Sequence, residues 1–439
     1  MDAPRATAHT CAVSHPQILL LENIHPSARH AYEDAGWPVE AIGRGLGEGE
    51  LIDALGALEP SLPLVLGIRS KSRVTARVLE AVPQLAVIGA YCIGTDQIDL
   101  PAARRQGVAV FNAPFSSTRS VAELVVGEVI MLSRQIFARS QAAHAGRWAK
   151  SAEGSHEVRG KTLGLVGYGH IGSQVSVLAE ALGMRVQYFD VVSKLPLGNA
   201  TACASLDELL ETSDFVSLHV PDTSGTRQMI GETEIARMKP GAHLLNLSRG
   251  QVVDLEALRG AVTDGKLAGA AIDVYPREPA KAGDAFDTPL RGLPSVILTP
   301  HIGGSTLEAQ ANIGREVSSA VTAFLAGGRS TGCVNLPQLD APPLKQGSRI
   351  INIHRNVPGV LSEINRVVAQ AAVNIDRQHL ATLDEVGMLI LDVSVDRDAP
   401  AAQDLATAIA GLETSIRTRI QTAESTDARV PQTTVGRVG

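Results

Sequence analysis

Three reactive side chains each follow an apolar, strand-like segment of the chain: Arg249, Glu278 and His301. Ligands of an open α/β sheet bind beyond the carboxyl ends of its strands, so we expect these side chains to face one site. The pKa of imidazole lies near working pH, which suits His301 as the base that removes a hydroxyl proton. Glu278 could fix its tautomer, and Arg249 could hold a substrate carboxylate through two hydrogen bonds. Such a set suits the oxidation of a 2-hydroxy acid by hydride transfer.

Each of these residues also has a plainer interpretation. An isolated Arg or Glu on a loop is usually a solvated charge, and a His after a proline often only caps a helix. Asp273, which ends the strand before Glu278, could tune the site electrostatically or merely finish that strand. The placement of three reactive residues at three strand ends favours the catalytic interpretation.

A glycine-rich turn upstream offers a place for the acceptor of the hydride. An apolar strand at 162–166 leads into Gly-Tyr-Gly-His-Ile-Gly at 167–172, a helical stripe follows, and a second strand ends at Asp190. The glycines allow a diphosphate to approach the helix N-terminus, and the acid can bond both ribose hydroxyls while repelling a 2′-phosphate. The pattern predicts NAD rather than NADP, and the alternative is a βαβ unit without a ligand. The residues expected to contact NAD are Gly167, Gly169, His170, Ile171, Gly172, Asp190 and Asp273.

The composition narrows the class of protein. The 439 residues predict about two to four domains, and an aromatic content of 3% leaves Val, Leu, Ile and Ala to build cores of buried parallel strands. The formal charge of −7 and the lack of a basic run argue against binding to nucleic acid or anionic membranes. No apolar run approaches the length that would span a membrane. The four cysteines are dispersed with no CxxC pair, and residues 1–15 lack the pattern of a secretion signal. We therefore expect a cytoplasmic protein with reduced thiols and no metal site.

Strand and helix signals alternate along most of the chain. Strands are predicted at 18–21, 63–68, 85–89 and 108–111 in a first block, and at 215–220, 243–247, 270–274 and 296–298 after the glycine-rich turn. This order predicts two doubly wound parallel sheets. A long helix at 119–139 should leave the first block and a helix at 306–326 should return to it, so the two domains are linked twice and leave a cleft.

A third block follows a proline-containing linker at 331–347. Its elements have the order strand, helix, strand, strand, helix, strand, which is the ferredoxin-like order. The domains are therefore expected at 16–114 with 300–330 for the substrate, at 115–299 for NAD, and at 348–421 for the third block. The polar ends, 1–15 and 422–439, are expected to be disordered.

Several motifs together resemble one enzyme family. They are Gly-Tyr-Gly-His-Ile-Gly at 167–172, Asn-Leu-Ser-Arg-Gly at 246–250, Ala-Ile-Asp-Val at 271–274, Glu-Pro at 278–279 and Thr-Pro-His-Ile-Gly-Gly at 299–304. This set resembles the D-isomer-specific 2-hydroxyacid dehydrogenases over residues 16 to 420, and most of all the bacterial members that end in an ACT domain. The resemblance implies Arg249, Glu278 and His301 as the catalytic set. It also implies NAD-dependent oxidation of 3-phosphoglycerate to 3-phosphohydroxypyruvate, the entry to L-serine synthesis.

A phosphorylated substrate requires cations in the first block. Arg69, Ser70 and Lys71 directly follow a predicted strand and are expected to bind the substrate, together with Ser117 and Arg249. The plainer interpretation of the 69–71 cluster is a solvated turn before the next helix. Relatives often carry Asn where this chain has Ser117 and Arg where it has Lys71, and both changes keep donors but alter their reach.

The C-terminal block resembles an ACT domain, whose strand edges pair between subunits and bind an amino acid there. The resemblance implies that His354, Asn356 and Asn374 hold L-serine, because amide and imidazole groups can pair with both ends of a zwitterion. A dimerisation module that binds nothing is the plainer alternative. Trp148, in the polar segment 145–160, resembles a family residue that makes an interlocking contact between subunits. It could also anchor this segment to its own domain. A homotetramer in which the effector acts on a distant active site is the expected assembly.

Two other functions stay open. Another D-2-hydroxyacid dehydrogenase, of the glyoxylate or hydroxyglutarate type, would be indifferent to the substrate's phosphate and to Arg69→Ala. A non-enzymatic NAD-sensing regulator would explain the glycine-rich turn, but not a serine-like pocket at His354.

Overall fold

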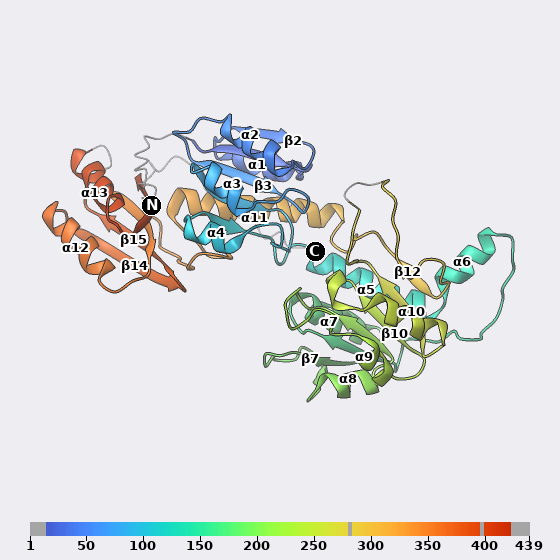
Figure 1. The fold of residues 1–439 in the computed structure, drawn as a ribbon. Helices are drawn as coiled ribbons and strands as arrows, with labels where there is room; N and C mark the ends of the chain where they lie inside the picture. The colour runs from blue at the N-terminus through green and yellow to red at the C-terminus, as the bar shows by residue number, and fades with distance from the viewer. Residues whose placement is uncertain (1–14, 280–282, 396–398, 423–439) are drawn as a thin grey trace, which may run out of the picture. The chain divides into compact units, whose positions relative to one another are not determined.

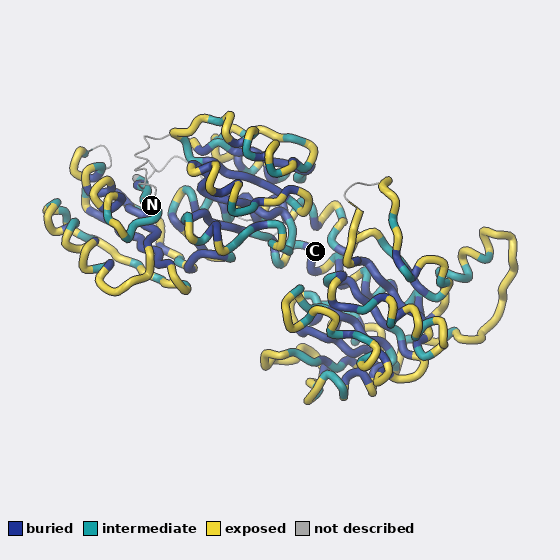
Figure 2. Tube along the Cα trace, viewed as in Figure 1, coloured by how far each residue is buried: buried dark blue, intermediate teal, exposed yellow. Residues whose placement is uncertain are grey.

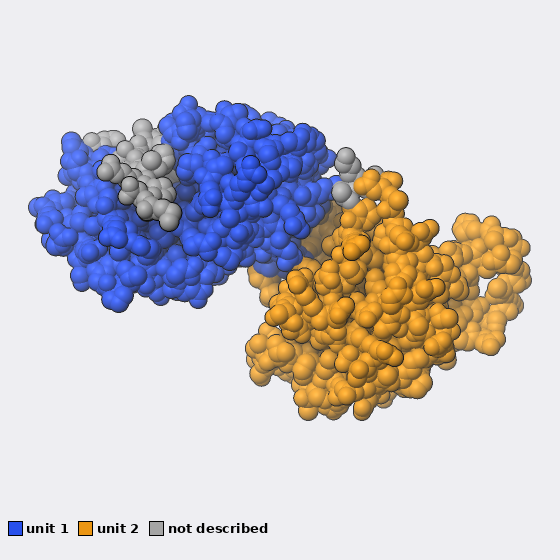
Figure 3. All heavy atoms as spheres, viewed as in Figure 1, with its two compact units in different colours: residues 1–114, 311–439 blue, residues 115–310 orange. Residues whose placement is uncertain are grey.

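The computed structural model of this chain describes residues 15–279, 283–395 and 399–422 (Figure 1). The chain divides into two compact units, one of residues 1–114 and 311–439 and one of residues 115–310 (Figure 3). Each unit has its own buried core, which follows the strands (Figure 2). Within the described part of the chain, no helix is both long enough and apolar enough to cross a membrane.

The first unit begins with a five-stranded parallel sheet. In spatial order its strands are β2 (Val39–Ile42), β1 (Gln17–Leu21), β3 (Leu64–Ile68), β4 (Leu85–Ala90) and β5 (Ala109–Phe111). The helices between them are α1 (Pro26–Asp34), α2 (Glu48–Gly56), α3 (Ala76–Ala81) and α4 (Leu100–Arg105). β3 and β4 are buried along their whole length, as expected at the centre of a sheet covered on both faces. The prediction of a doubly wound sheet is confirmed.

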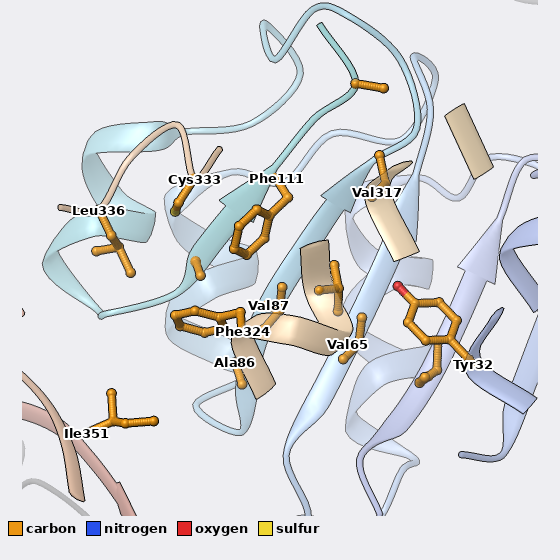
Figure 4. Close-up of a cluster of buried hydrophobic side chains, with 14 of the residues drawn as sticks. Tyr32, Val65, Ala86, Val87, Phe111, Val317, Phe324, Cys333, Leu336 and Ile351 are labelled. Carbon is orange, nitrogen blue, oxygen red and sulfur yellow. The ribbon is translucent and has the colours of Figure 1, made fainter. Parts of the chain in front are cut away.

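The long helix α11 (Leu307–Gly327) returns the chain to this sheet. Phe324 of α11 packs against Phe111 of β5, with ring centroids 5.6 Å apart. Figure 4 shows both rings in one apolar cluster with Val317 of α11 and Ile351 of the C-terminal sheet. The core of the first unit is therefore built from segments that lie far apart along the chain.

The C-terminal part of the first unit is a four-stranded antiparallel sheet with two helices. In spatial order its strands are β14 (Ile375–Leu383), β15 (Val386–Val393), β13 (Ser348–Arg355) and β16 (Ser415–Thr422). The helices are α12 (Val360–Gln370) and α13 (Pro400–Ala410). The chain order confirms the ferredoxin-like prediction, and β14 and β16 form the two edges of the sheet.

The second unit is built on a seven-stranded parallel sheet. In spatial order its strands are β12 (Val296–Leu298), β11 (Leu267–Ile272), β10 (Ala242–Asn246), β9 (Phe215–Leu218), β6 (Thr162–Val166), β7 (Arg185–Phe189) and β8 (Thr201–Ala202). Its helices are α5 (Thr118–Ser133), α6 (Ile136–His144), α7 (His170–Ala181), α8 (Leu206–Thr212), α9 (Glu232–Arg237) and α10 (Leu255–Thr263). The strand order reverses beside β6, and open α/β sheets bind ligands at such a switch point.

Some features differ from what the sequence predicts. The prediction of a single helix at 119–139 is wrong. The helix is interrupted between α5 and α6, where Gln135 adopts a left-handed conformation with a φ of 53°. β2 is absent from the predicted strands, since it is an edge strand with no buried residue and lacks a clear apolar pattern. The second crossing between the units lies at 310/311, inside α11, and not at 299/300. Of the ends predicted to be disordered, 1–15 and 422–439, residues 1–14 and 423–439 fall outside the described residues, whereas Thr422 is the last residue of β16.

Candidate active site and cofactor turn

A histidine and a glutamate are in hydrogen-bond contact after the carboxyl ends of β11 and β12. The Nδ1 atom of His301 is 2.8 Å from Oε2 and 3.0 Å from Oε1 of Glu278. Both side chains stay partly accessible, with 52% of the His301 side chain and 36% of the Glu278 side chain exposed. The contact at Nδ1 leaves Nε2 as the ring atom that can meet a substrate. The structure therefore brings the predicted base and the predicted acid together.

Asp273 holds the backbone that carries His301. Its carboxylate accepts hydrogen bonds from the Thr299 hydroxyl at 2.6 Å and from the N–H groups of Ile302 and Gly303 at 2.8 Å each. His301 has a φ of 54°, which non-glycine residues rarely adopt, and such strain persists only where neighbouring contacts impose it. Asp273 is 1% exposed, so its carboxylate acts on this loop, and its contact with the cofactor stays a prediction.

Arg249 follows β10 on a loop that closely approaches the segment after β11. The side-chain amide of Asn246 donates to the Arg249 carbonyl at 2.9 Å. A Cβ atom at Gly250 would lie only 2.0 Å from the carbonyl carbon of Tyr275, so only glycine allows this approach. The loop thereby holds the Arg249 charge within electrostatic reach of the histidine and the glutamate.

The three charged groups perturb one another. The hydrogen bond that His301 donates to Glu278 raises the pKa of His301 above its ordinary value of 6.5, while burial and the Arg249 charge oppose this shift. Burial alone would raise the pKa of Glu278, but the contacts with His301, the Tyr275 N–H and Arg249 outweigh it and lower that pKa. An ionised glutamate therefore supports an imidazole that takes up a proton readily, as a general base requires. Among the described residues, no group of three His, Cys, Asp or Glu side chains could hold a metal ion.

The turn between β6 and α7 has the form that a pyrophosphate site needs. Gly167 has a φ of 93°, and a Cβ atom there would lie 2.4 Å from the His219 carbonyl oxygen. A Cβ atom at Gly172 would lie 2.3 Å from the Gly167 carbonyl oxygen, whereas one at Gly169 would meet nothing within 4 Å. Among the residues that the structure describes, no side chain caps α7, so its first N–H groups are open to an anion. This turn, which we call the cofactor turn (residues 167–172), fits the diphosphate of NAD, which when bound supplies the acceptor of the hydride.

Asp190 lies at the end of β7, close to this turn. Its Oδ2 atom accepts a hydrogen bond from the Tyr168 N–H at 2.8 Å, and its Oδ1 atom accepts one from the Val192 N–H at 2.9 Å. These bonds fix the carboxylate where the ribose of a bound dinucleotide is expected. The first two residues of α7 complete the turn. The ring of His170 meets the Phe115 ring edge-on, with centroids 4.4 Å apart, and Ile171 packs partly into the core.

The predicted substrate residues are divided between the two units. Ser117 precedes α5 in the second unit and is only 2% exposed. Arg69, Ser70 and Lys71 follow β3 in the first unit, where Ser70 and Lys71 are exposed and Arg69 is half-buried. We call residues 69–72 the cationic loop. Its binding of substrate stays a prediction.

A cavity of about 190 Å³ lies beside the end of β13 in the C-terminal sheet. The residues that line it are His354, Asn356, Val357, Gly359, Val360, Leu361, Ser362, Leu380 and Thr382. His354 is 1% exposed, its Nδ1 atom is 3.0 Å from the Asn352 amide oxygen, and burial lowers its pKa, so the ring is neutral at pH 7. Asn374, the third predicted effector residue, does not line this cavity. It precedes the first residue of β14, whereas the cavity lies near the last residues of that strand.

An acid that the sequence-based prediction missed is buried on α5. Glu128 is 1% exposed, and neither oxygen of its carboxyl group has a hydrogen-bond partner among the described residues. Burial, and then the nearby charge of Asp273, raises the pKa of Glu128 to about 8. Glu128 continues the apolar stripe of Val121, Val125 and Leu132, and an acid in such a stripe is a signal that could have revealed it.

Glu128→Gln should change how the free energy of unfolding depends on pH. The folded chain keeps the Glu128 proton up to about pH 8, whereas the unfolded chain releases it near 4.5, so the wild type loses stability as pH rises between these values. Gln does not titrate, so relative to the wild type the variant should gain on the order of 4 kcal/mol from about pH 5 to pH 8. Urea unfolding at several pH values measures this difference.

The matched control for this prediction is Glu123→Gln, at an exposed position of the same helix. Its difference from the wild type should stay constant over the same pH range. A constant difference for Glu128→Gln as well would mean that the buried carboxyl is already ionised in the folded chain.

Comparison with known proteins agrees with this geometry. The family described as D-isomer specific 2-hydroxyacid dehydrogenase, NAD binding domain, matches residues 126–303, and the AHAS small subunit-like ACT domain matches residues 350–410. A relative from Dictyostelium discoideum named D-3-phosphoglycerate dehydrogenase is 48% identical over 404 residues, which cover 92% of this chain and 97% of that protein. A relative of the same name from Escherichia coli K12 is 45% identical over 405 residues, with the same coverage.

A solved structure of similar fold carries the expected cofactor. The D-lactate dehydrogenase of Aquifex aeolicus, complexed with NAD and lactic acid, is 29% identical to this chain and superposes with a TM-score of 0.60. The likeness covers 70% of this chain and 95% of that structure. The chain therefore belongs to the D-isomer-specific 2-hydroxyacid dehydrogenases as an NAD-dependent oxidoreductase, and it carries an ACT domain after its two α/β domains.

Proposed function

We propose that this chain oxidises 3-phospho-D-glycerate to 3-phosphohydroxypyruvate with NAD, the first step of L-serine biosynthesis. The 2.8 Å contact between His301 and Glu278 carries this proposal, because it supplies an oriented base within the unit that holds the cofactor turn. The names of the curated relatives, which align with nearly the whole chain, support the choice of substrate.

In the proposed reaction, His301 removes the proton of the C2 hydroxyl through Nε2. Glu278 accepts a hydrogen bond from Nδ1, which assigns the tautomer and stabilises the imidazolium that forms. Arg249 binds the substrate carboxylate and stabilises the negative charge that develops on the C2 oxygen. The same imidazolium returns its proton in the reverse reaction.

The cationic loop is the proposed site for the substrate phosphate, because Arg69 and Lys71 flank one exposed serine. Arg69→Ala should raise KM for 3-phosphoglycerate by about 10- to 100-fold, since a charge-assisted hydrogen bond is lost. The kcat/KM for D-glycerate, which lacks the phosphate, should change by less than about threefold. Steady-state formation of NADH measures both substrates.

Arg77→Ala is the control for this experiment, since Arg77 is exposed on α3 and pairs with Glu48 outside the loop. Its KM for 3-phosphoglycerate should match that of the wild type. If Arg69→Ala affects the two substrates equally, or neither, a glyoxylate or hydroxyglutarate type of dehydrogenase becomes the better assignment.

The cavity at His354 and Asn356 is the proposed site for L-serine, completed by a second subunit. β14 is an edge strand, so two copies can pair antiparallel along it. Such pairing would bring Asn374 of the partner subunit, which precedes its β14, toward Thr382 at the far end of this strand, where the cavity lies. Amide and imidazole groups from both subunits could then pair with the two charged ends of the amino acid.

Asn356→Ala should raise the L-serine concentration for half-maximal inhibition by about tenfold or more, because the proposed hydrogen bond of its amide to the amino acid is lost. Initial rates measured against L-serine concentration test this. Asn365→Ala, on the exposed face of α12, is the control and should keep the sensitivity of the wild type. A wild-type enzyme that L-serine does not inhibit would leave the ACT domain with an assembly role only.

The proposed assembly is a homotetramer in the cytoplasm. Trp148 is 88% exposed on the arm after α6, and an indole so exposed is suited to contact with another copy. The arm and the β14 edge provide two different self-contacts, and two such contacts together generate four copies. Light scattering of the wild-type protein measures the assembly.

A further inference from the structure

Glu22, a buried acid directly after β1, is hydrogen-bonded to the cationic loop. The residue is only 7% exposed. Its Oε2 atom accepts hydrogen bonds from the N–H groups of Ser70 and Lys71 at 2.9 Å each, and its Oε1 atom accepts one from Ser72 at 2.7 Å. One side chain therefore binds three consecutive backbone N–H groups of the loop.

This contact uses both oxygens of the Glu22 carboxylate. A carboxylate only accepts hydrogen bonds, whereas an amide of the same size presents one acceptor and one donor group. Hydrogen bonds to a charged acceptor are about twice as strong as neutral ones. Successive N–H groups that point to one place form an anion site, and here the anion is the protein's own Glu22.

The loop is also held at both of its ends. The side-chain amide of Gln97 donates to the Arg69 carbonyl, and the Ser72 hydroxyl accepts a hydrogen bond from the Leu46 N–H at 3.1 Å. Ser72 is fully buried, whereas Lys71 is exposed. The loop backbone is therefore fixed while the Lys71 side chain stays accessible.

The backbone at Glu22 is strained in a way that fits this role. Glu22 has a φ of 63° and Asn23 a φ of 51°, and non-glycine residues rarely adopt this left-handed conformation. The Glu22 N–H donates to the Ile42 carbonyl of β2 at 3.0 Å, which holds the turn in place. Strain of this kind is typical of positions that serve a ligand site.

We propose that Glu22 is a positioning residue that sets the preference for a phosphorylated substrate. Its carboxylate accepts hydrogen bonds from the N–H groups of residues 70–72, so these groups do not bind the phosphate. The side chains of Arg69 and Lys71 then recognise the phosphate. Glu22 holds the backbone that sets the spacing of these two cations. This inference rests on the proposed role of the cationic loop in binding 3-phosphoglycerate.

The test compares Glu22→Gln with Glu59→Gln in the full-length enzyme. Glu22→Gln should raise KM for 3-phosphoglycerate by about tenfold or more and leave kcat and KM for NAD within about threefold. The ratio of kcat/KM for 3-phosphoglycerate to kcat/KM for D-glycerate should fall by a similar factor, and a merely structural role would not move this ratio. Glu59 also accepts a backbone N–H, from Ser61 at 3.2 Å, but lies outside the loop, so Glu59→Gln should keep the wild-type ratio.

The remaining variants separate the possible failures. Glu22→Asp keeps the charge on a shorter side chain and should give an intermediate ratio. If Arg69→Ala leaves KM for 3-phosphoglycerate unchanged, the loop does not bind substrate and the proposed function itself fails. If Arg69→Ala raises that KM but Glu22→Gln keeps the wild-type ratio, only the role of Glu22 is overturned. Failure of both Glu22 variants to fold would assign the residue to stability and would also overturn the proposal.

Discussion

His301→Gln is expected to lower kcat for 3-phosphoglycerate oxidation by about 10²- to 10⁴-fold, the usual contribution of a general base. An amide cannot take up a proton near neutral pH, so the C2 hydroxyl would have to lose its proton to water. The reverse reaction should slow by the same factor, because the imidazolium form of His301 returns that proton. NADH formation and consumption, followed by absorbance, measure the two directions.

Binding of NADH separates loss of catalysis from loss of the fold. His301 lies outside the β6–α7 turn, so the affinity for NADH, measured by fluorescence titration, should stay within about threefold of the wild type. His30→Gln, at an exposed position of α1, is the control and should keep both activity and affinity. A His301→Gln enzyme that binds NADH and turns over at the wild-type rate would show that another group is the base.

Glu278→Gln is expected to lower kcat by about 10²-fold and to move the pH profile of oxidation to lower pH. Oxidation requires neutral His301, so kcat/KM rises as the pH passes through the pKa of this group. In the wild type the hydrogen bond to Glu278 raises that pKa above 6.5, and the acid limb of the profile lies above that value. Without the carboxylate the pKa falls, so a larger fraction of His301 is neutral at low pH.

The loss of kcat in this variant has a separate cause. The amide of Gln can donate to Nδ1 as well as accept from it, so the tautomer with a free Nε2 is no longer enforced. Profiles of kcat/KM between about pH 5 and pH 9 test the shift, and Glu256→Gln, at an exposed position of α10, is the control that should keep the wild-type midpoint. An unchanged midpoint in Glu278→Gln would mean that the limb reports a group other than His301.

The strand, turn and helix of the glycine-rich segment could be predicted from the sequence because their signals are local. A strand, three glycines within six residues, a helical stripe and a terminal acid follow one another between 162 and 190. The break at Gln135 could not be predicted, because the residues on both sides of it favour a helix. The segment between α6 and β6 imposes this break. The His156 N–H donates to the Ser133 carbonyl at 2.8 Å, and Gly154 packs against the Gln135 side chain.

Residue types and their order along the chain were enough to identify the family, the cofactor and the three catalytic candidates, because strand ends and glycine turns leave local patterns. Folding decided which of these groups touch. It placed His301 and Glu278, 23 positions apart, at 2.8 Å, and it placed the Glu22 carboxylate 2.9 Å from the N–H group of Ser70, 48 positions later. Periodicity and turn chemistry act over a few residues, whereas hydrogen bonds between strand ends and the burial of Glu128 arise only once the sheets have formed. The pKa values that tune the active site are therefore properties of the tertiary structure.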